Sequence, residues 1–148
     1  MTAGEHYLAS GLPSPVPARD GLDGPYWEGA REGVLRVQRC DSCGGHQWGP
    51  EWMCHRCQSF DVGWVDVDPV GTIYSWERSW HPVHPALADQ GPYVVVLVEL
   101  AHVDGVRMLG NLLGDPHIDV EIGANVEAVF EQHDDAEHPH ALVQLRRI

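Results

Sequence analysis

The sequence predicts a mainly β protein, in which an N-terminal arm and a short helix precede a small cysteine-rich unit and a five-stranded β-barrel. Two C-x-x-C pairs, ten residues apart, indicate a small unit built on two tight turns. In the second half of the chain, apolar and polar residues alternate in successive short runs, as in half-buried strands. No helical pattern long enough for a crossover separates these runs, which favours antiparallel pairing. We therefore expect three parts, at residues 1–33, 34–63 and 64–148.

The first part should be extended and then helical. Glycines and prolines recur from Gly11 to Gly24 and permit no stable element, so this stretch is expected to be an arm. Such an arm either lies on a partner or is a mobile terminus. A short helix is expected at residues 25–33, because Pro25 suits a first helical turn and Gly33 suits a helix stop.

All the cysteines of the chain lie in the second part, at Cys40, Cys43, Cys54 and Cys57. Each C-x-x-C turn directs two thiolates to one point, and two such turns supply the closed tetrahedral set that structural Zn(II) accepts. Two disulfides, a thioredoxin-like redox pair and buried thiols are alternatives. A redox pair leaves the second pair unexplained, and the opening sequence lacks the signal-peptide features that would imply an oxidising compartment. A rubredoxin-like zinc ribbon is favoured, with a structural ion that has no open catalytic position.

The strands follow in order. Residues 34–38 should form the strand that leads into the first cysteine turn, and residues 62–80 read as one long strand or as two short strands with a bulge. Asp104 and Gly105 form the signal of a tight hairpin turn. Together with the strand that ends near residue 80, four further runs give five strands, for which the OB-fold barrel is the commonest architecture: residues 93–100, 106–113, 125–131 and 141–146.

Four of the tryptophans in the ribbon and on the strand that leaves it are of interest: Trp48, Trp52, Trp76 and Trp80. The first two are expected to cover the sulfurs and to pack against the barrel. Because large exposed aromatic residues often anchor interfaces, the four together are candidates for one broad surface that binds a partner.

Two loops carry histidines. Residues 79–92 hold His81 and His84, each followed by proline, and these imidazoles are candidates for a substrate channel. The alternative is that both histidines only satisfy local backbone groups. Residues 133–140 are acidic and rich in histidine, and they are expected to form a solvated hairpin loop.

Composition excludes several functions. There are 22 acidic against 9 basic residues, giving a formal net charge of -13, which argues against nucleic-acid binding. Every basic residue is arginine, so a Schiff-base lysine and a P-loop are both impossible. No apolar run approaches the roughly 20 residues that span a bilayer, so we expect a soluble, cytoplasmic protein without membrane insertion.

The order of these parts resembles the zinc-ribbon and OB-fold family first catalogued as domain of unknown function 35. The resemblance covers about residues 20–148 and is carried by PYWEG, LRVQRCDSCGGHQWGPEWMCHRC, VGTIYSWERSWHPVHPAL, GPYVVVLVEL and IGANVEAVFE. Many members have Pro-Pro-Arg between the knuckles, where this chain has Gly49, Pro50 and Glu51. That departure exchanges a positive charge for a negative one.

The resemblance implies a non-catalytic subunit of a thiolase-like acyl-CoA enzyme. It is strongest with the branch that pairs with a sterol-carrier-type thiolase to form an aldolase acting on steroid side-chain CoA thioesters. The CoA thioester would then be the substrate of the complex, and the thiolase-like dimer would carry two copies of this chain in a heterotetramer. The alternatives are a stand-alone acyl-CoA or lipid carrier, and a subunit of an acyl-CoA hydratase or thiolase assembly.

Overall fold

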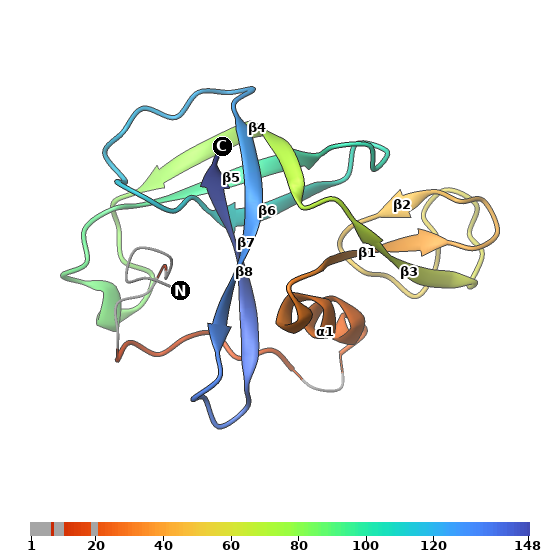
Figure 1. Cartoon of the computed structure of the whole chain (residues 1–148), viewed down its shortest axis with the longest axis horizontal. Helices are drawn as coiled ribbons and strands as arrows, with labels where there is room; N and C mark the ends of the chain where they lie inside the picture. Colours follow the sequence, from red (N-terminus) through yellow and green to blue (C-terminus); the bar gives the residue numbers. More distant parts are fainter. Residues whose placement is uncertain (1–6, 8–10, 19–20) are drawn as a thin grey trace.

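The computed structural model of the chain describes Tyr7, residues 11–18 and residues 21–148, and most of the first ten positions of the expected arm lie outside the described residues. Within these residues, eight strands form two sheets, and one helix and one 3-10 turn accompany them (Figure 1). Their bounds are α1 Gly24–Glu32, β1 Leu35–Cys40, β2 His46–Gln47, β3 Val62–Val67, β4 Val70–Ser79, η1 Pro85–Leu87, β5 Tyr93–Leu100, β6 Arg107–Asn111, β7 Asn125–His133 and β8 His140–Arg147.

The helix lies where the sequence predicts it. Pro25 occupies its first turn, and Gly33 ends it in the left-handed conformation, with φ of 76° and an N–H bond to Ala30 O. Its buried face consists of Tyr26, Gly29 and Ala30. Because this face packs against both β1 and β8, α1 joins the two sheets of the molecule (Figure 1).

The small sheet has the order β2-β1-β3, and we call residues 35–67 the ribbon. β1 pairs with β3 from Leu35↔Val67 to Cys40↔Val62. The segment 62–80 is therefore two strands, as one of the alternatives predicted, but they belong to different sheets. Asp68 and Pro69 separate β3 from β4, and the bulge lies further on, between Ile73 and Ser75.

The large sheet has the order β6-β5-β4-β7-β8 and is antiparallel throughout. The predicted number of strands is confirmed, but the sheet does not close into a full barrel. Just after β6, the chain joins β8 through the parallel bridge Leu112↔Leu145 and the bond from Leu113 N–H to Leu145 O, 2.8 Å, and Asn111 Nδ2 donates to Gln144 Oε1 at 3.1 Å. At this contact a Cβ on Gly110 would lie 2.9 Å from Leu145 Cδ1, so a larger residue there would push the Leu145 side chain aside.

The apolar core lies inside the large sheet. β5 alternates strictly between partly buried and buried positions, and Val94, Val96 and Val98 point inward. Asp104 and Gly105 both have positive φ and form the turn between β5 and β6, as expected, within a loop of residues 101–106. No helix in the described part of the chain has the length and apolar character needed to cross a membrane.

Candidate functional site

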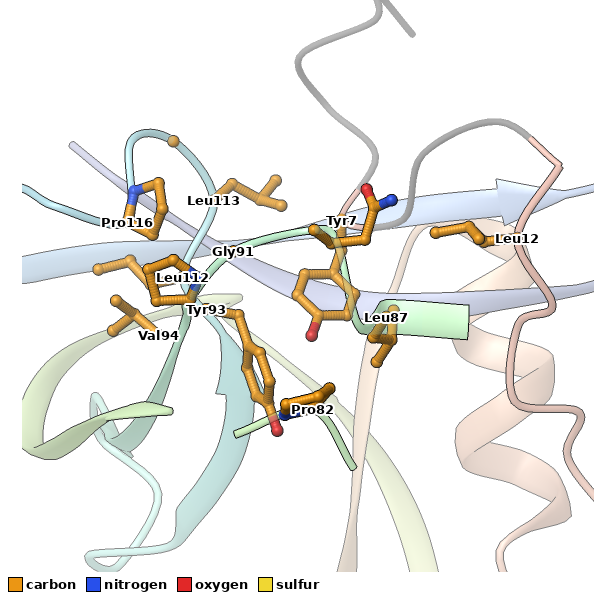
Figure 2. Close-up of a pocket in the computed structure, with 13 residues that line it drawn as sticks. Tyr7, Leu12, Pro82, Leu87, Gly91, Tyr93, Val94, Leu112, Leu113 and Pro116 are labelled. Carbon is orange, nitrogen blue, oxygen red and sulfur yellow. The ribbon is translucent and has the colours of Figure 1, made fainter. Parts of the chain in front are cut away.

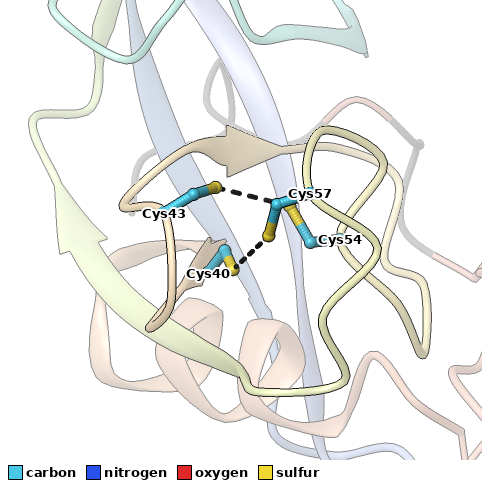
Figure 3. Close-up of side chains that lie close together, drawn as sticks. All are labelled: Cys40, Cys43, Cys54 and Cys57. Carbon is cyan, nitrogen blue, oxygen red and sulfur yellow. Dashed lines mark hydrogen bonds between the residues drawn. The ribbon is translucent and has the colours of Figure 1, made fainter.

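The two C-x-x-C turns bring four sulfurs together. Cys40 ends β1, Cys43 follows in the next turn, and Cys54 and Cys57 come from the second turn (Figure 3). All four sulfurs lie within 4.8 Å of one another, with 3.6 Å between Cys40 and Cys57 and 3.7 Å between Cys43 and Cys54. With Zn–S bonds of about 2.3 Å, the edge of a tetrahedral site is about 3.8 Å, so the donor set fits a structural Zn(II). A disulfide would require about 2.05 Å.

Matching backbone hydrogen bonds hold both turns. Cys40 N–H donates to Gly45 O and its carbonyl accepts from Gly44, while Cys54 N–H donates to Ser59 O and its carbonyl accepts from Gln58. Gly44 and Gln58 both have positive φ, at 75° and 62°. Each turn therefore closes through a left-handed residue placed directly after its second cysteine.

Backbone donors also favour a thiolate at the buried end of the site. Cys54 is 1% exposed, and Arg56 N–H donates to its sulfur at 3.4 Å. Hydrogen bonds from the backbone of Cys57 and then Arg56 lower the pKa of Cys54 to about 6, against the opposing effect of desolvation. A lowered pKa favours the thiolate, which is the form a metal binds.

Two buried glutamines position the second turn. Gln38 and Gln47 are each 1% exposed, and Gln47 Nε2 donates to Gln38 Oε1 at 2.8 Å. Gln38 Oε1 also accepts from Glu51 N–H, and Gln47 Oε1 accepts from His55 N–H. Sequence reasoning missed this role, because Gln38 follows the inward-facing Val37 and alternation along a strand would place it on the exposed face.

A polar contact ties the ribbon to the large sheet. Asp104, in the loop between β5 and β6, accepts from His46 N–H at 3.0 Å and lies 2.8 Å from His46 Nδ1. Arg56 Nη1 is 3.8 Å from the same carboxylate oxygen. The hydrogen bonds from His46 hold the pKa of Asp104 below its ordinary value.

We expect Asp104→Asn to loosen this contact, because the amide replaces a charged acceptor. The contribution of a carboxylate with a lowered pKa is present above the ordinary pKa of aspartate and is lost as the pH falls through the folded-state value. Hydrogen exchange at His46 N–H should therefore be several-fold faster in the variant at neutral pH, and the difference should vanish in acid. Asp119→Asn, an exposed residue of the loop between β6 and β7, is the matched control. Equal exchange in all three proteins at neutral pH would contradict the role of this contact.

The four candidate tryptophans fall at different places. Trp48 is half-buried and packs on Tyr26, with ring centroids 4.7 Å apart, so it contacts the helix. Trp52 is 72% exposed on the ribbon. β4 starts beside the ribbon and runs to the opposite side of the molecule (Figure 1), carrying Trp76 and, just beyond its end, Trp80. The expected single surface is therefore divided, because β4 is an extended strand that leads away from the cysteines.

The two candidate histidines are both exposed in the loop after β4. His84 Nδ1 accepts a hydrogen bond from Ala86 N–H at 3.1 Å and caps η1. This contact favours the local structural role for His84. His81 follows Trp80, whose ring lies 5.8 Å from that of His117.

A buried polar cluster on β7 and β8 was not expected, since the acidic segment around it reads as a solvated loop. Glu131 is fully buried, His133 lies 2.8 Å from it, and Gln144 Nε2 donates to it at 3.1 Å. The rings of His133 and His140 stack 5.0 Å apart. Only residues 134–139 form the turn itself, so the histidines at its ends belong to the strands. Alternation along β7 gave no signal for this cluster, because Val126 and Ala128 are buried and a strict period of two would put Glu131 on the opposite face.

The described fold and its cysteine cluster define a zinc-ribbon and OB-fold protein. Residues 27–63 match the family model described as "ChsH2, rubredoxin-like zinc ribbon domain", and residues 64–131 match "ChsH2, C-terminal OB-fold domain". The solved structure "Ltp2-ChsH2(DUF35) aldolase" is 33% identical, with a TM-score of 0.70 over 90% of this chain and 98% of that chain. The chain belongs to the DUF35 family of ChsH2-type proteins.

Two curated relatives are longer. A "Probable enoyl-CoA hydratase alpha subunit" of Thermomonospora curvata is 39% identical over 105 residues, which are 70% of this chain. The "3-oxo-4,17-pregnadiene-20-carboxyl-CoA hydratase alpha subunit" of Mycobacterium tuberculosis is 32% identical over 105 residues, 71% of this chain. In both cases the match covers 32% of the relative, so the chain corresponds to about a third of their length.

Proposed function

We propose that this chain is a non-catalytic accessory subunit of a thiolase-like acyl-CoA enzyme, in which a structural Zn(II) holds the ribbon. The best-supported reaction is retro-aldol cleavage of steroid side-chain CoA thioesters by the complex. The main observation in support is the structural similarity to the Ltp2-ChsH2 aldolase over nearly the whole of both chains. One relative is named as a 3-oxo-4,17-pregnadiene-20-carboxyl-CoA hydratase subunit, which supports a steroid side-chain CoA thioester as the substrate class.

The side chains of this protein support the accessory role. A Schiff-base aldolase needs a lysine, and the sequence has none. The cysteines form the closed cluster, so none is left as a nucleophile. The two candidate loop histidines are exposed, and one of them caps a 3-10 turn. The acid and base of the reaction are therefore assigned to the partner.

The expected assembly is a heterotetramer, in which each protomer of a two-fold thiolase-like dimer carries one copy of this chain. The exposed apolar residues Trp80 and Val83, at the start of the loop after β4, are the proposed contact with the partner. The binding of acyl-CoA would then occur where the two subunits meet.

A subunit of an acyl-CoA hydratase is the second candidate, favoured by the names of both longer relatives. A stand-alone acyl carrier is the third. Purification of the tagged chain from its own cells separates them, because the proposed subunit should bring down a thiolase-like protein in an equal molar amount. Recovery of a hydratase instead would support the second candidate, and recovery of the chain alone would contradict the accessory role.

A further inference from the structure

A partly open pocket, lined mainly by residues with apolar side chains, lies at the end of the large sheet away from the ribbon. Its volume is about 350 Å³, within the range of small-molecule sites. Three segments build its walls beside the start of β5: the loop after β4, the chain that follows β6, and the N-terminal arm (Figure 2). Leu87 from the loop after β4, Leu113 from the chain after β6 and Leu12 from the arm each line the pocket.

Two described residues of the arm, Tyr7 and Leu12, line this pocket. Tyr7 N–H donates to the buried carboxylate of Glu131 at 2.7 Å, and Ser14 Oγ lies 3.3 Å from Nε2 of the buried His140. The cluster on β7 and β8 therefore holds both Tyr7 and the residues after Leu12 in place. This accounts for a buried acidic group that the metal centre does not use.

Two tyrosines and Gln90 supply the polar side-chain groups of the lining. The rings of Tyr7 and Tyr93 meet edge to face with centroids 6.0 Å apart, and Figure 2 shows both hydroxyls on the side of Pro82. Burial, followed by the proximity of Tyr93 and Glu131, raises the pKa of Tyr7 to about 12. At neutral pH its hydroxyl is protonated and can donate a hydrogen bond to an oxygen on a ligand.

Charge is missing from the lining. None of the described residues that line the pocket is acidic or basic. The formal charge of the chain is -13, so an anionic ligand would also meet an unfavourable field. Burying a phosphate or carboxylate here would leave a charge without a partner, which is costly.

We propose that this pocket binds the uncharged, apolar acyl end of the thioester and excludes the CoA nucleotide, which the partner must hold. That the ligand is an acyl thioester rests on the proposed function, whereas the preference for an uncharged, apolar group rests on the lining of the pocket. The cavity selects an alicyclic or alkyl group that carries an oxygen able to accept from a tyrosine hydroxyl. It also predicts that the chain alone binds apolar molecules, without turnover.

The test is a fluorescence titration of the full-length, zinc-loaded chain with the uncharged probe N-phenyl-1-naphthylamine. The wild-type chain should bind the probe, and 1-decanol should displace it, whereas free CoA should not. Leu87→Trp and Leu113→Trp, which fill the pocket from two walls, should each weaken probe binding by about tenfold or more. Leu109→Trp is the matched control, because Leu109 is 71% exposed on β6 outside the pocket, and its affinity should stay unchanged.

Zinc content and circular dichroism of each variant confirm that it is folded. Absence of probe binding to the wild-type chain would overturn the proposal, as would equal binding by the filled variants or displacement by CoA as readily as by decanol. Two filling variants are used so that a folding defect in one leaves the other to decide. Copurification with the thiolase-like partner does not depend on this result, so the two proposals fail separately.

Discussion

Cys54→Ser is expected to release the metal and unfold the ribbon. Cys54 is buried, and it provides one of four ligands in a closed set. Structural zinc contributes on the order of 10 kcal/mol to folding in small domains, comparable to the whole stability of about 5–15 kcal/mol of a typical domain. The remaining apolar residues of a three-stranded ribbon cannot replace that contribution. Elemental analysis and thermal unfolding measure the two effects.

Met53→Ser is the matched control for this variant. Met53 precedes Cys54, its side chain is 39% exposed, and the hydrogen bond that Gln47 makes here goes to the backbone carbonyl. The control should keep one zinc per chain and the melting temperature of the wild type. Stoichiometric zinc in Cys54→Ser, or no zinc in the unchelated wild-type protein, would contradict the structural metal site.

Trp80→Ala should weaken assembly with the partner by about 2 kcal/mol, or roughly thirtyfold in Kd, which is the typical loss at an aromatic hot spot. Trp80 is 67% exposed in the free chain, so the free energy of unfolding should barely change. It stands two residues before Pro82, which lines the apolar pocket. An interface at Trp80 would therefore place the pocket beside the partner. Titration calorimetry with the copurified partner measures the affinity.

Trp52→Ala tests the other exposed aromatic site. Because Trp52 is 72% exposed on the ribbon, at the other side of the molecule from the end of β4, its loss should affect affinity less than the loss of Trp80 (Figure 1). A larger effect of Trp52→Ala would indicate that the interface lies on the ribbon.

In the same complex, His81→Ala and His84→Ala should leave zinc content and assembly intact while lowering kcat or raising KM. Full activity of both variants would make the loop only structural.

Local patterns in the sequence predicted the parts of this molecule that depend on neighbouring residues. The cysteine spacing predicted that four sulfurs lie together, and Gly33 predicted the end of the helix, where it adopts the left-handed conformation. The alternating runs predicted the strands, because each strand buries one face. The helix stop and the alternation depend on residues within one turn or one strand, and the cluster joins two turns that the repeated C-x-x-C spacing already pairs.

Long-range pairing was harder to predict. Nothing local in residues 62–67 shows that β3 pairs with β1 and not with the large sheet. The incomplete closure between β6 and β8 likewise depends on contacts between segments that are distant in the sequence, such as the bridge Leu112↔Leu145. Glu131 was missed because its partners come from Tyr7, His133 and Gln144, two of which are distant in sequence. The apolar pocket was missed for the same reason, since one of its walls comes from the N-terminal arm.

The central claim is that the chain serves a catalytic partner, and turnover of a steroid side-chain acyl-CoA thioester tests it most directly. Retro-aldol cleavage should be measured for the zinc-loaded chain alone, for the copurified thiolase-like protein alone, and for the two recombined. We expect cleavage by the recombined complex and none by this chain alone. Cleavage by this chain without its partner, or equal cleavage by the partner with and without this chain, would contradict the accessory role.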